Sequence, residues 1–198
     1  MTKKQNKKDK KGQKHKATYK MANVVVNVFL KKQLPLKSIA DRFRDVQFNL
    51  NKFPGIHIKM KQPKCAVLLF KNGKMVITGL KRTKDIKNVV EKVTNKLNQI
   101  GIEVPKNPER KIVNLVISLD FGININLDHA IIYLESSVYE PEVFPGIIFR
   151  MYDPVKAVFL IFSSGKAVLT GIQDEKVIPQ AIKELGIMLK KNDLLIGF

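Results

Sequence analysis

Four residues, FPGI at positions 53–56, occur again as FPGI at positions 144–147, an offset of 91 residues. At the same offset, NVVV (23–26) matches NLVI (114–117). At an offset of 92, LFKNGK (69–74) matches IFSSGK (161–166), and VITG (76–79) matches VLTG (168–171). Four matched blocks in one order indicate a duplicated unit of about 90 residues. Because so long a unit has only two copies, we expect pseudo-twofold symmetry and not a solenoid.

Each unit has the pattern of a mixed α+β fold. A β-branched run (ANVVVNVFL in the first unit, KIVNLVISLD in the second) predicts a strand. A short amphipathic helix is expected next, near 35–44 in the first unit and 127–135 in the second. Three or four strands follow, with hairpin turns such as KNGK and SSGK. A longer helix closes each unit. Its apolar stripe comprises Ile86, Val89, Val90, Val93, Leu97 and Ile100 in the first unit, and Ile182, Leu185 and Leu189, after Pro179, in the second.

The chain divides into three parts by composition. Residues 1–20 hold nine Lys and one Asp, and we expect this lysine-rich tail to be disordered. Its function stays open between a solubilising tail, a nuclear-localisation signal and a nonspecific DNA tether. Residues 21–104 form the first repeat and residues 105–198 the second.

Positive charge is concentrated in one half of the folded part. The net charge is +19, which indicates a polyanionic partner. Residues 21–101 hold 17 Lys/Arg against four Asp/Glu, whereas residues 102–198 hold 10 against 12. We therefore expect contact with phosphate mainly in the first repeat.

Several classes of protein are disfavoured. A single cysteine, Cys65, excludes an internal disulfide, and its apolar surroundings predict a buried thiol. No apolar stretch is long enough for a membrane span, so we expect a soluble intracellular protein without a membrane partner. The histidines His15, His57 and His129 lack the spacing of metal ligands or of a catalytic group. We expect no enzyme, no cofactor and no metal.

The helices cover one side of the predicted sheet, and nothing is left to cover the other. Residues two apart on a strand share a face, so this open face is apolar with small polar groups. It could also be core, packed on an unidentified element, but Phe53 and Phe144 lie beside Pro-Gly turns, where core residues are less expected. A flat apolar surface with aromatic wedges and basic edges suits the DNA minor groove. The face comprises Asn23, Val25, Leu68, Val76, Thr78, Asn114, Val116, Leu160, Val168 and Thr170.

The longest matched strings carry a family resemblance. Residues 139–151 (YEPEVFPGIIFRM), 160–166 (LIFSSGK) and 168–171 (VLTG) resemble the second repeat of the TATA-binding protein family, and residues 70–79 (FKNGKMVITG) resemble the first. The resemblance covers roughly residues 20–195. It implies a pseudo-twofold saddle of two β-α-β4-α repeats, one curved antiparallel sheet with helices on the convex face. The implied function is that of a general transcription initiation factor in a preinitiation complex.

The resemblance also implies residue roles. It makes Phe53, Phe70, Phe144 and Phe162 the wedges that enter DNA, and Asn23 and Asn114, with Thr78 and Thr170, the groups that bond to base edges. Val25, Leu68, Val76, Val116, Leu160 and Val168 would form the apolar floor. The resemblance also implies a set of basic residues that contact phosphate; the alternative is that they form only a solvated basic edge. These residues are Lys52, Lys59, Lys64, Lys74, Arg150 and Lys166.

Partners follow from the same resemblance. The implied ligand is double-stranded TATA-like DNA. The implied protein partner is a transcription factor IIB-like protein that binds at Glu140 and Glu142, and a transcription factor IIA-like protein is a second candidate protein partner. A solvated acidic turn is the alternative for the two glutamates. The expected location is the nucleus, or the site of viral transcription for a viral source. The alternative function is a related regulator with relaxed DNA preference that acts mainly through protein partners.

The second repeat departs from the family pattern. It is one residue short before Tyr139 and one residue long between Pro154 and Phe162. The extra residue predicts a bulge near Val155-Lys156 that shifts Phe162. Asp153 stands near a position that is basic in the family. These departures indicate a divergent member, from a large DNA virus or an AT-rich microbe, in which strict TATA preference is the property most in doubt.

Overall fold

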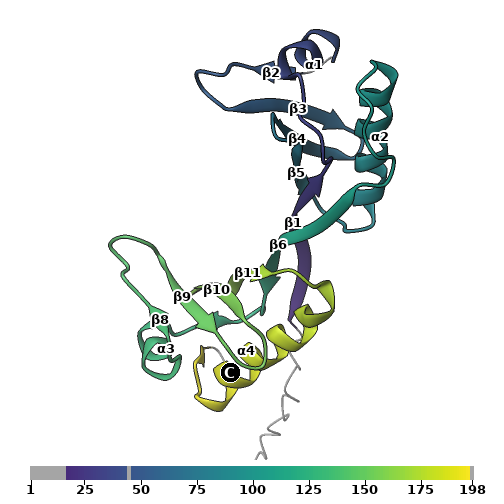
Figure 1. The fold of residues 1–198 in the computed structure, drawn as a ribbon. Helices are drawn as coiled ribbons and strands as arrows, with labels where there is room; N and C mark the ends of the chain where they lie inside the picture. The colour runs from purple at the N-terminus through teal and green to yellow at the C-terminus, as the bar shows by residue number, and fades with distance from the viewer. Residues whose placement is uncertain (1–16, 44–45, 197–198) are drawn as a thin grey trace, which may run out of the picture.

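The computed structural model describes residues 17–43 and 46–196, and the chain runs through two repeats of the same element order (Figure 1). The predicted tail at residues 1–16 lies outside the described residues. Each repeat is a strand, a short helix, four strands and a long helix. The first contains β1 (Thr18–Phe29), α1 (Leu36–Arg42), β2 (Val46–Phe48), β3 (Gly55–Lys61), β4 (Lys64–Phe70), β5 (Lys74–Leu80) and α2 (Asp85–Gln99).

The second repeat adds two short strands to this plan. The strands β7 (Asn124–Ile125) and β12 (Leu195–Ile196) pair with each other as a small separate sheet, which the sequence did not predict. No helix in the described part of the chain is long and apolar enough to cross a membrane. The other elements are β6 (Glu109–Asp120), α3 (Leu127–Tyr133), β8 (Ser137–Val138), β9 (Gly146–Met151), β10 (Ala157–Phe162), β11 (Lys166–Ile172), the 3-10 turn η1 (Glu175–Val177) and α4 (Ile178–Lys191).

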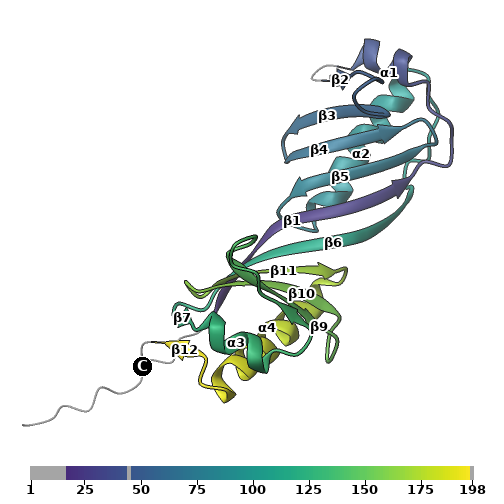
Figure 2. The ribbon, with the colours of Figure 1, turned by 90° about the vertical axis from the view of Figure 1, so that its left-hand side faces the viewer.

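Ten strands form one antiparallel sheet in the order β2-β3-β4-β5-β1-β6-β11-β10-β9-β8. The order is symmetric about the central pair β1 and β6. Figures 1 and 2 show the sheet curved into a saddle, with α2 and α4 against its convex side and α1 and α3 near its outer ends. The concave face carries no helix over the described residues. The predicted α+β saddle is therefore confirmed.

The central pair corrects one predicted boundary. β1 begins at Thr18 and not at Met21, because Thr18, Tyr19 and Lys20 pair with the end of β6; Thr18 lies opposite Asp120. These three residues belong to the sheet and not to the lysine-rich tail. The strand pairing supplies backbone hydrogen bonds that the local lysine-rich composition does not predict.

Alternation along the strands separates core from open face. In β1, Val24, Val26 and Val28 are buried against the helices, whereas Val25 between them is only half-buried. The predicted stripes of α2 and α4 are buried as well, except that Ile100 lies one residue beyond the end of α2 and is partly exposed. The two short helices end at Arg42 and Tyr133, two residues before the predicted ends.

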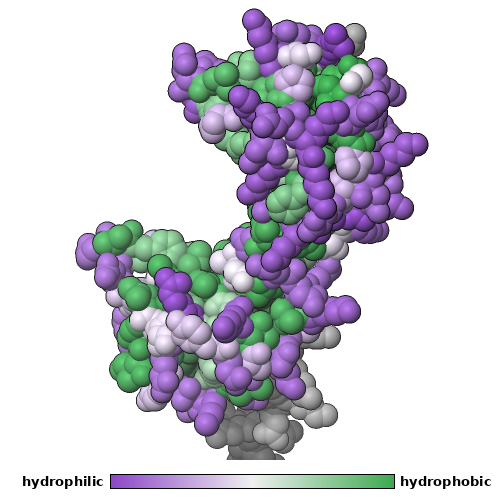
Figure 3. Space-filling model, viewed as in Figure 1, coloured by the Kyte–Doolittle hydropathy of each residue, from purple (hydrophilic) through white to green (hydrophobic). Residues whose placement is uncertain are grey.

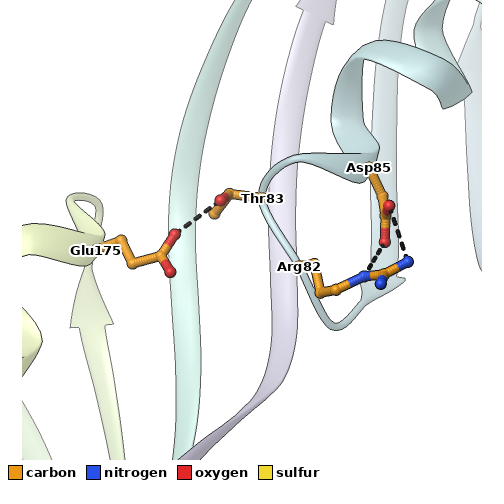
Figure 4. A network of polar contacts seen from close by, with 4 residues as sticks. All are labelled: Arg82, Thr83, Asp85 and Glu175. Carbon is orange, nitrogen blue, oxygen red and sulfur yellow. Dashed lines mark hydrogen bonds and ion pairs between the residues drawn. The ribbon is translucent and has the colours of Figure 1, made fainter.

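The two repeats also meet through side chains on the connections that follow β5 and β11. The Thr83 hydroxyl donates a hydrogen bond of 2.7 Å to Glu175 Oε2 (Figure 4). These two residues are 92 positions apart, so they occupy equivalent places in the two repeats. Arg82 donates two hydrogen bonds, of 2.8 and 3.1 Å, to the Asp85 carboxylate at the start of α2. The loop that carries Thr83 is thereby fixed to its own helix.

Burial of Cys65 on β4 leads to a prediction about its reactivity. Burial raises the pKa of the thiol to about 11, although Lys92 opposes this. A rise of two units lowers the thiolate fraction about 100-fold, and only the thiolate reacts readily. We expect iodoacetamide to label the folded chain slowly at neutral pH and the chain in guanidinium chloride rapidly, as measured by mass spectrometry. Equal rates would show that β4 is accessible in the folded protein.

Candidate nucleic-acid interface

The concave face is built from alternate residues along the strands of the ten-stranded sheet. On β4, Leu68 and Phe70 point to this side, while Val67 and Leu69 are buried beneath the helices. The strand pairing places Leu68 opposite Val76. Every predicted floor and base-contact residue lies at a half-buried position of this alternation. They form one continuous surface across both repeats.

Two asparagines occupy the centre of this surface. Across the β1–β6 pair, Asn23 lies opposite Val116 and Asn114 lies opposite Val25. Asn23 Oδ1 accepts from Gly79 N at 2.6 Å, and its Nδ2 donates to the Thr78 hydroxyl at 3.2 Å.

The second repeat reproduces the arrangement. Asn114 Oδ1 accepts from Gly171 N at 2.9 Å, and its Nδ2 donates to the Thr170 hydroxyl at 3.1 Å. An amide nitrogen has two hydrogens. With one of them held by threonine, the other is available to a ligand on the open face. The predicted Asn and Thr residues are thus brought together as two matched units.

A pair of phenylalanines lies toward each outer end of the face. The rings of Phe53 and Phe70 are 5.6 Å apart between centroids and tilted by 57°. Those of Phe144 and Phe162 are 5.7 Å apart and tilted by 61°. Both centroid distances lie in the range of stabilising aromatic contacts, the first pair being tilted and the second edge-to-face. The near identity of the pairs shows that the four predicted wedge residues form two equivalent structures.

A glycine supports each phenylalanine pair. A Cβ atom on Gly55 would lie 2.7 Å from the carbonyl oxygen of Leu69, and 3.0 and 3.3 Å from the rings of Phe53 and Phe70. On Gly146 it would lie 2.8 Å from the carbonyl oxygen of Ile161 and 3.1 Å from each ring. Backbone and rings leave no room for a side chain. The Phe-Pro-Gly motif therefore sets the position of the rings as well as the turn.

The expected bulge near Val155-Lys156 is wrong, and Phe162 is not shifted. Phe162 lies opposite Gly146 just as Phe70 lies opposite Gly55, and the β9–β10 pairing runs without a register shift. The extra residue lies in the segment between these strands: five residues separate the paired Met151 and Ala157, whereas four separate the equivalent pair Met60 and Cys65 in the first repeat. A longer hairpin connection at the surface absorbs an insertion without breaking ladder hydrogen bonds.

Most of the predicted basic positions are exposed around the apolar floor. Lys74 is half-buried, and its cross-sheet neighbour on β1 is the apolar Phe29. Lys166, its equivalent in the second repeat, lies opposite Asp120 on β6. A carboxylate beside Lys166 reduces the attraction of that position for phosphate. The exposed positions are Lys52, Lys59, Lys64, Arg150 and Lys166.

Hydropathy differs between the two repeats. In the view of Figure 3, hydrophilic residues dominate the surface of the first repeat, whereas hydrophobic residues gather over the second, around β8, β9 and α3. The loop between β8 and β9 carries Glu140 and Glu142, both exposed, and Val143, which is 80% exposed. Acidic and apolar groups are therefore accessible together at this end of the saddle.

Sequence reasoning missed several residues of the concave face. Asn27 lies opposite Val76, and Ala66 lies opposite both Thr78 and Lys59, so the sheet alternation places them on the floor. His57 lies opposite Leu68 on the same side. The period-two alternation of the strands indicates these positions, but their residues differ between the two repeats, so they do not occur in the matched blocks. The missed positions are Asn27, His57, Lys61, Ala66, Ser118, Ile148 and Val158.

The fold and the open concave face define a class of two-repeat β-saddle proteins. The family model described as "Transcription factor TFIID (or TATA-binding protein, TBP)" matches residues 18–100 and 109–192. The chain belongs to this TATA-binding protein family. It is accordingly a DNA-binding factor of transcription initiation and not an enzyme.

Individual relatives agree with this assignment. The chain is 40% identical over 178 residues to a TATA-box-binding protein of Pyrobaculum calidifontis, covering 90% of this chain and 89% of the relative. It is 41% identical over 182 residues to one of Aeropyrum pernix, covering 92% and 89%. The solved structure of Methanococcus jannaschii TBP superimposes with a TM-score of 0.79 at 37% identity, covering 87% of this chain and 98% of that one.

The glycine beneath each wedge pair can be tested directly. Gly146→Ala should lower the free energy of unfolding by ~1–3 kcal/mol, because the new methyl group overlaps a backbone oxygen and two rings. Gly186→Ala is the matched control: the nearest atom to its new Cβ is 3.8 Å away, and alanine favours a helix. Urea unfolding measures both. Equal stability of Gly146→Ala and the parent would show that the phenylalanine pair is loosely packed.

Proposed function

We propose that this chain binds TATA-like promoter DNA through the minor groove, bends it, and recruits a transcription factor IIB-like protein and RNA polymerase. The observation that carries the proposal is the pair of matched phenylalanine contacts at the two ends of an uncharged apolar floor. The relatives are named TATA-box-binding proteins, which supports the same ligand. The chain acts wherever its genome is transcribed, whether in a nucleus or at a site of viral transcription.

The floor matches the chemistry of A·T base pairs. In the minor groove these pairs display only acceptors, whereas a G·C pair adds the amino group of guanine. Valine and leucine side chains cannot accept a hydrogen bond from that group. The free amide hydrogens of Asn23 and Asn114 can donate to the acceptors of A·T pairs at the centre of the site. The floor therefore favours A·T sequences in two ways: it offers no acceptor to the amino group of guanine, and its asparagines donate to the acceptors of A·T pairs.

The phenylalanine pairs are placed to open base steps. Insertion of apolar wedges from the minor-groove side, with kinking of the duplex, is the established mode of this family, and unstacking a step costs a few kcal/mol. The cost is offset by the additional protein surface that bent DNA contacts. Because the two pairs have the same geometry, each end of the bound segment is kinked in the same way.

Removal of a wedge provides the test of DNA binding. Phe53→Ala or Phe144→Ala should weaken binding to a TATA duplex about tenfold or more and reduce the bend, since the kinked steps close. Nonspecific binding should persist, because it depends on the lysines. Binding is measured by mobility shift and bending by energy transfer between dyes on the DNA ends.

Tyr133→Ala is the control for this experiment. It removes an exposed aromatic residue from α3, which lies outside the concave face. It should bind and bend DNA as the parent does. Normal bending by both phenylalanine variants would mean that these residues are not wedges.

The acidic loop between β8 and β9 supports a protein partner at the second repeat. Glu140 and Glu142 are exposed beside Phe144, and carboxylates so close to the duplex would repel phosphate if they faced it. A transcription factor IIB-like protein with a basic surface complements them. A transcription factor IIA-like protein is a second candidate partner.

Reversal of one charge tests this docking role. Glu142→Arg should abolish the ternary complex with the transcription factor IIB-like protein and leave DNA binding unchanged or slightly stronger. Glu103→Arg, the same charge change at an exposed residue of the linker between the repeats, is the control. Mobility shift with purified partner and TATA duplex measures both complexes. A normal ternary complex with Glu142→Arg would refute the docking role and leave DNA binding untouched.

The charge of the second repeat favours one alternative function. Residues 102–198 hold 10 Lys/Arg against 12 Asp/Glu, so this half has little attraction for phosphate. Such a chain could act as a regulator that contacts mainly proteins and has a relaxed DNA preference. Competition between TATA and scrambled duplexes separates the two functions, because only the initiation factor discriminates strongly.

A further inference from the structure

The outer arms of the concave face differ in polarity between the repeats. In the first repeat, Gln47 on β2 lies opposite His57 on β3, which in turn lies opposite Leu68 on β4. In the second, Val138 on β8 lies opposite Ile148 on β9, which lies opposite Leu160 on β10. Gln47 and His57 precede Val138 and Ile148 by 91 residues, so the two pairs are equivalent. A polar pair therefore stands where the symmetry-related pair is apolar.

Gln47 and His57 are joined by a hydrogen bond. His57 Nδ1 lies 3.2 Å from Gln47 Oε1. With the Gln47 amide in this orientation, Oε1 only accepts, so the tautomer of His57 that forms this hydrogen bond carries its proton on Nδ1. In the neutral imidazole this leaves Nε2 with a free lone pair that can accept a hydrogen bond. Both side chains are accessible to a ligand on the open face.

The pair lies between the wedge and a basic residue of the same strand. Along β3, His57 is two residues from Gly55, which supports the Phe53–Phe70 pair, and two residues from Lys59. All three positions share the concave side. DNA that is kinked by the phenylalanines and held at Lys59 must pass over His57. This placement rests on the proposed minor-groove binding.

We propose that the Gln47–His57 pair is a specificity element that lets the first repeat accept a G·C pair next to its wedge. The amino group of guanine is the donor that distinguishes G·C from A·T in the minor groove, and the free imidazole nitrogen accepts from it. Over Val138 and Ile148 the same amino group stays buried without a partner, which is strongly unfavourable. The second repeat therefore requires A·T at the equivalent place.

The consequence is a preferred direction on the DNA. A site with a G·C pair at one end only is bound with the first repeat over that end. We expect a preference of about tenfold between the two directions, because the guanine amino group is hydrogen-bonded in one direction and left without a partner in the other. The fold itself is pseudo-symmetric, so this pair supplies a distinction that the β-sheet does not.

The direction of binding can be measured by energy transfer. The chain carries one dye at Ile132→Cys, an exposed site on α3, in a Cys65→Ala background, and the duplex carries the other dye at one end. On a TATA duplex with one terminal G·C pair, we expect about ten complexes to one with the first repeat over that pair. The double variant Gln47→Val, His57→Ile should bring the ratio close to one. An all-A·T duplex gives the reference ratio for each protein.

A reciprocal variant completes the design. Val138→Gln with Ile148→His makes both arms polar, so it should also lose the preference but bind duplexes with G·C at both ends better than the parent. An unchanged preference in the Gln47→Val, His57→Ile variant would overturn the inference, as would an equal ratio in the parent. Failure of the parent to distinguish TATA from scrambled duplexes would instead refute the proposed function. Normal TATA binding with an unbiased direction would refute the specificity element alone.

Discussion

Pairing of β1 with β6 is the interaction on which the rest of the structure depends. It joins two five-stranded halves into one sheet, from Thr18 opposite Asp120 to Phe29 opposite Glu109. It also removes two long strand edges that would otherwise invite aggregation. The edges that remain, β2 and β8, have three and two residues. The natural twist between neighbouring strands accumulates over ten of them and bends the sheet into the saddle.

The elements of the fold could be predicted where their periodicity was strong. The stripe from Ile86 to Leu97 identified α2, and the hairpin at Gly73 identified the turn between β4 and β5. The small sheet of β7 and β12 could not be predicted, since two-residue strands have no period and form only when Leu195 meets Ile125. The start of β1 could not be predicted either, because Thr18, Tyr19 and Lys20 follow a lysine-rich segment and become a strand only by pairing with the end of β6.

The candidate site was predictable to the extent that the repeats agree. Phe53 and Phe144, or Asn23 and Asn114, are found because each has an equivalent at the same offset. The hydrogen bonds from Gly79 and Gly171 to those asparagines depend on which strands pair, and the local sequence does not determine that pairing. The His57–Gln47 contact was missed because the equivalent positions of the second repeat carry Ile148 and Val138, so the comparison of the repeats gives no match there.

Duplication constrains the two surfaces of the sheet unequally. On the convex side, Val24 and Leu115 must pack against helices, so a change of volume is costly in both repeats. On the concave rim, Lys74 faces Phe29 while Lys166 faces Asp120, and neither arrangement disturbs the core. An open apolar face of this size risks self-association, and a net charge of +19 opposes it through repulsion between molecules. Most of the charge in the folded part lies in the first repeat, so the symmetric fold meets its ligand with two chemically different halves.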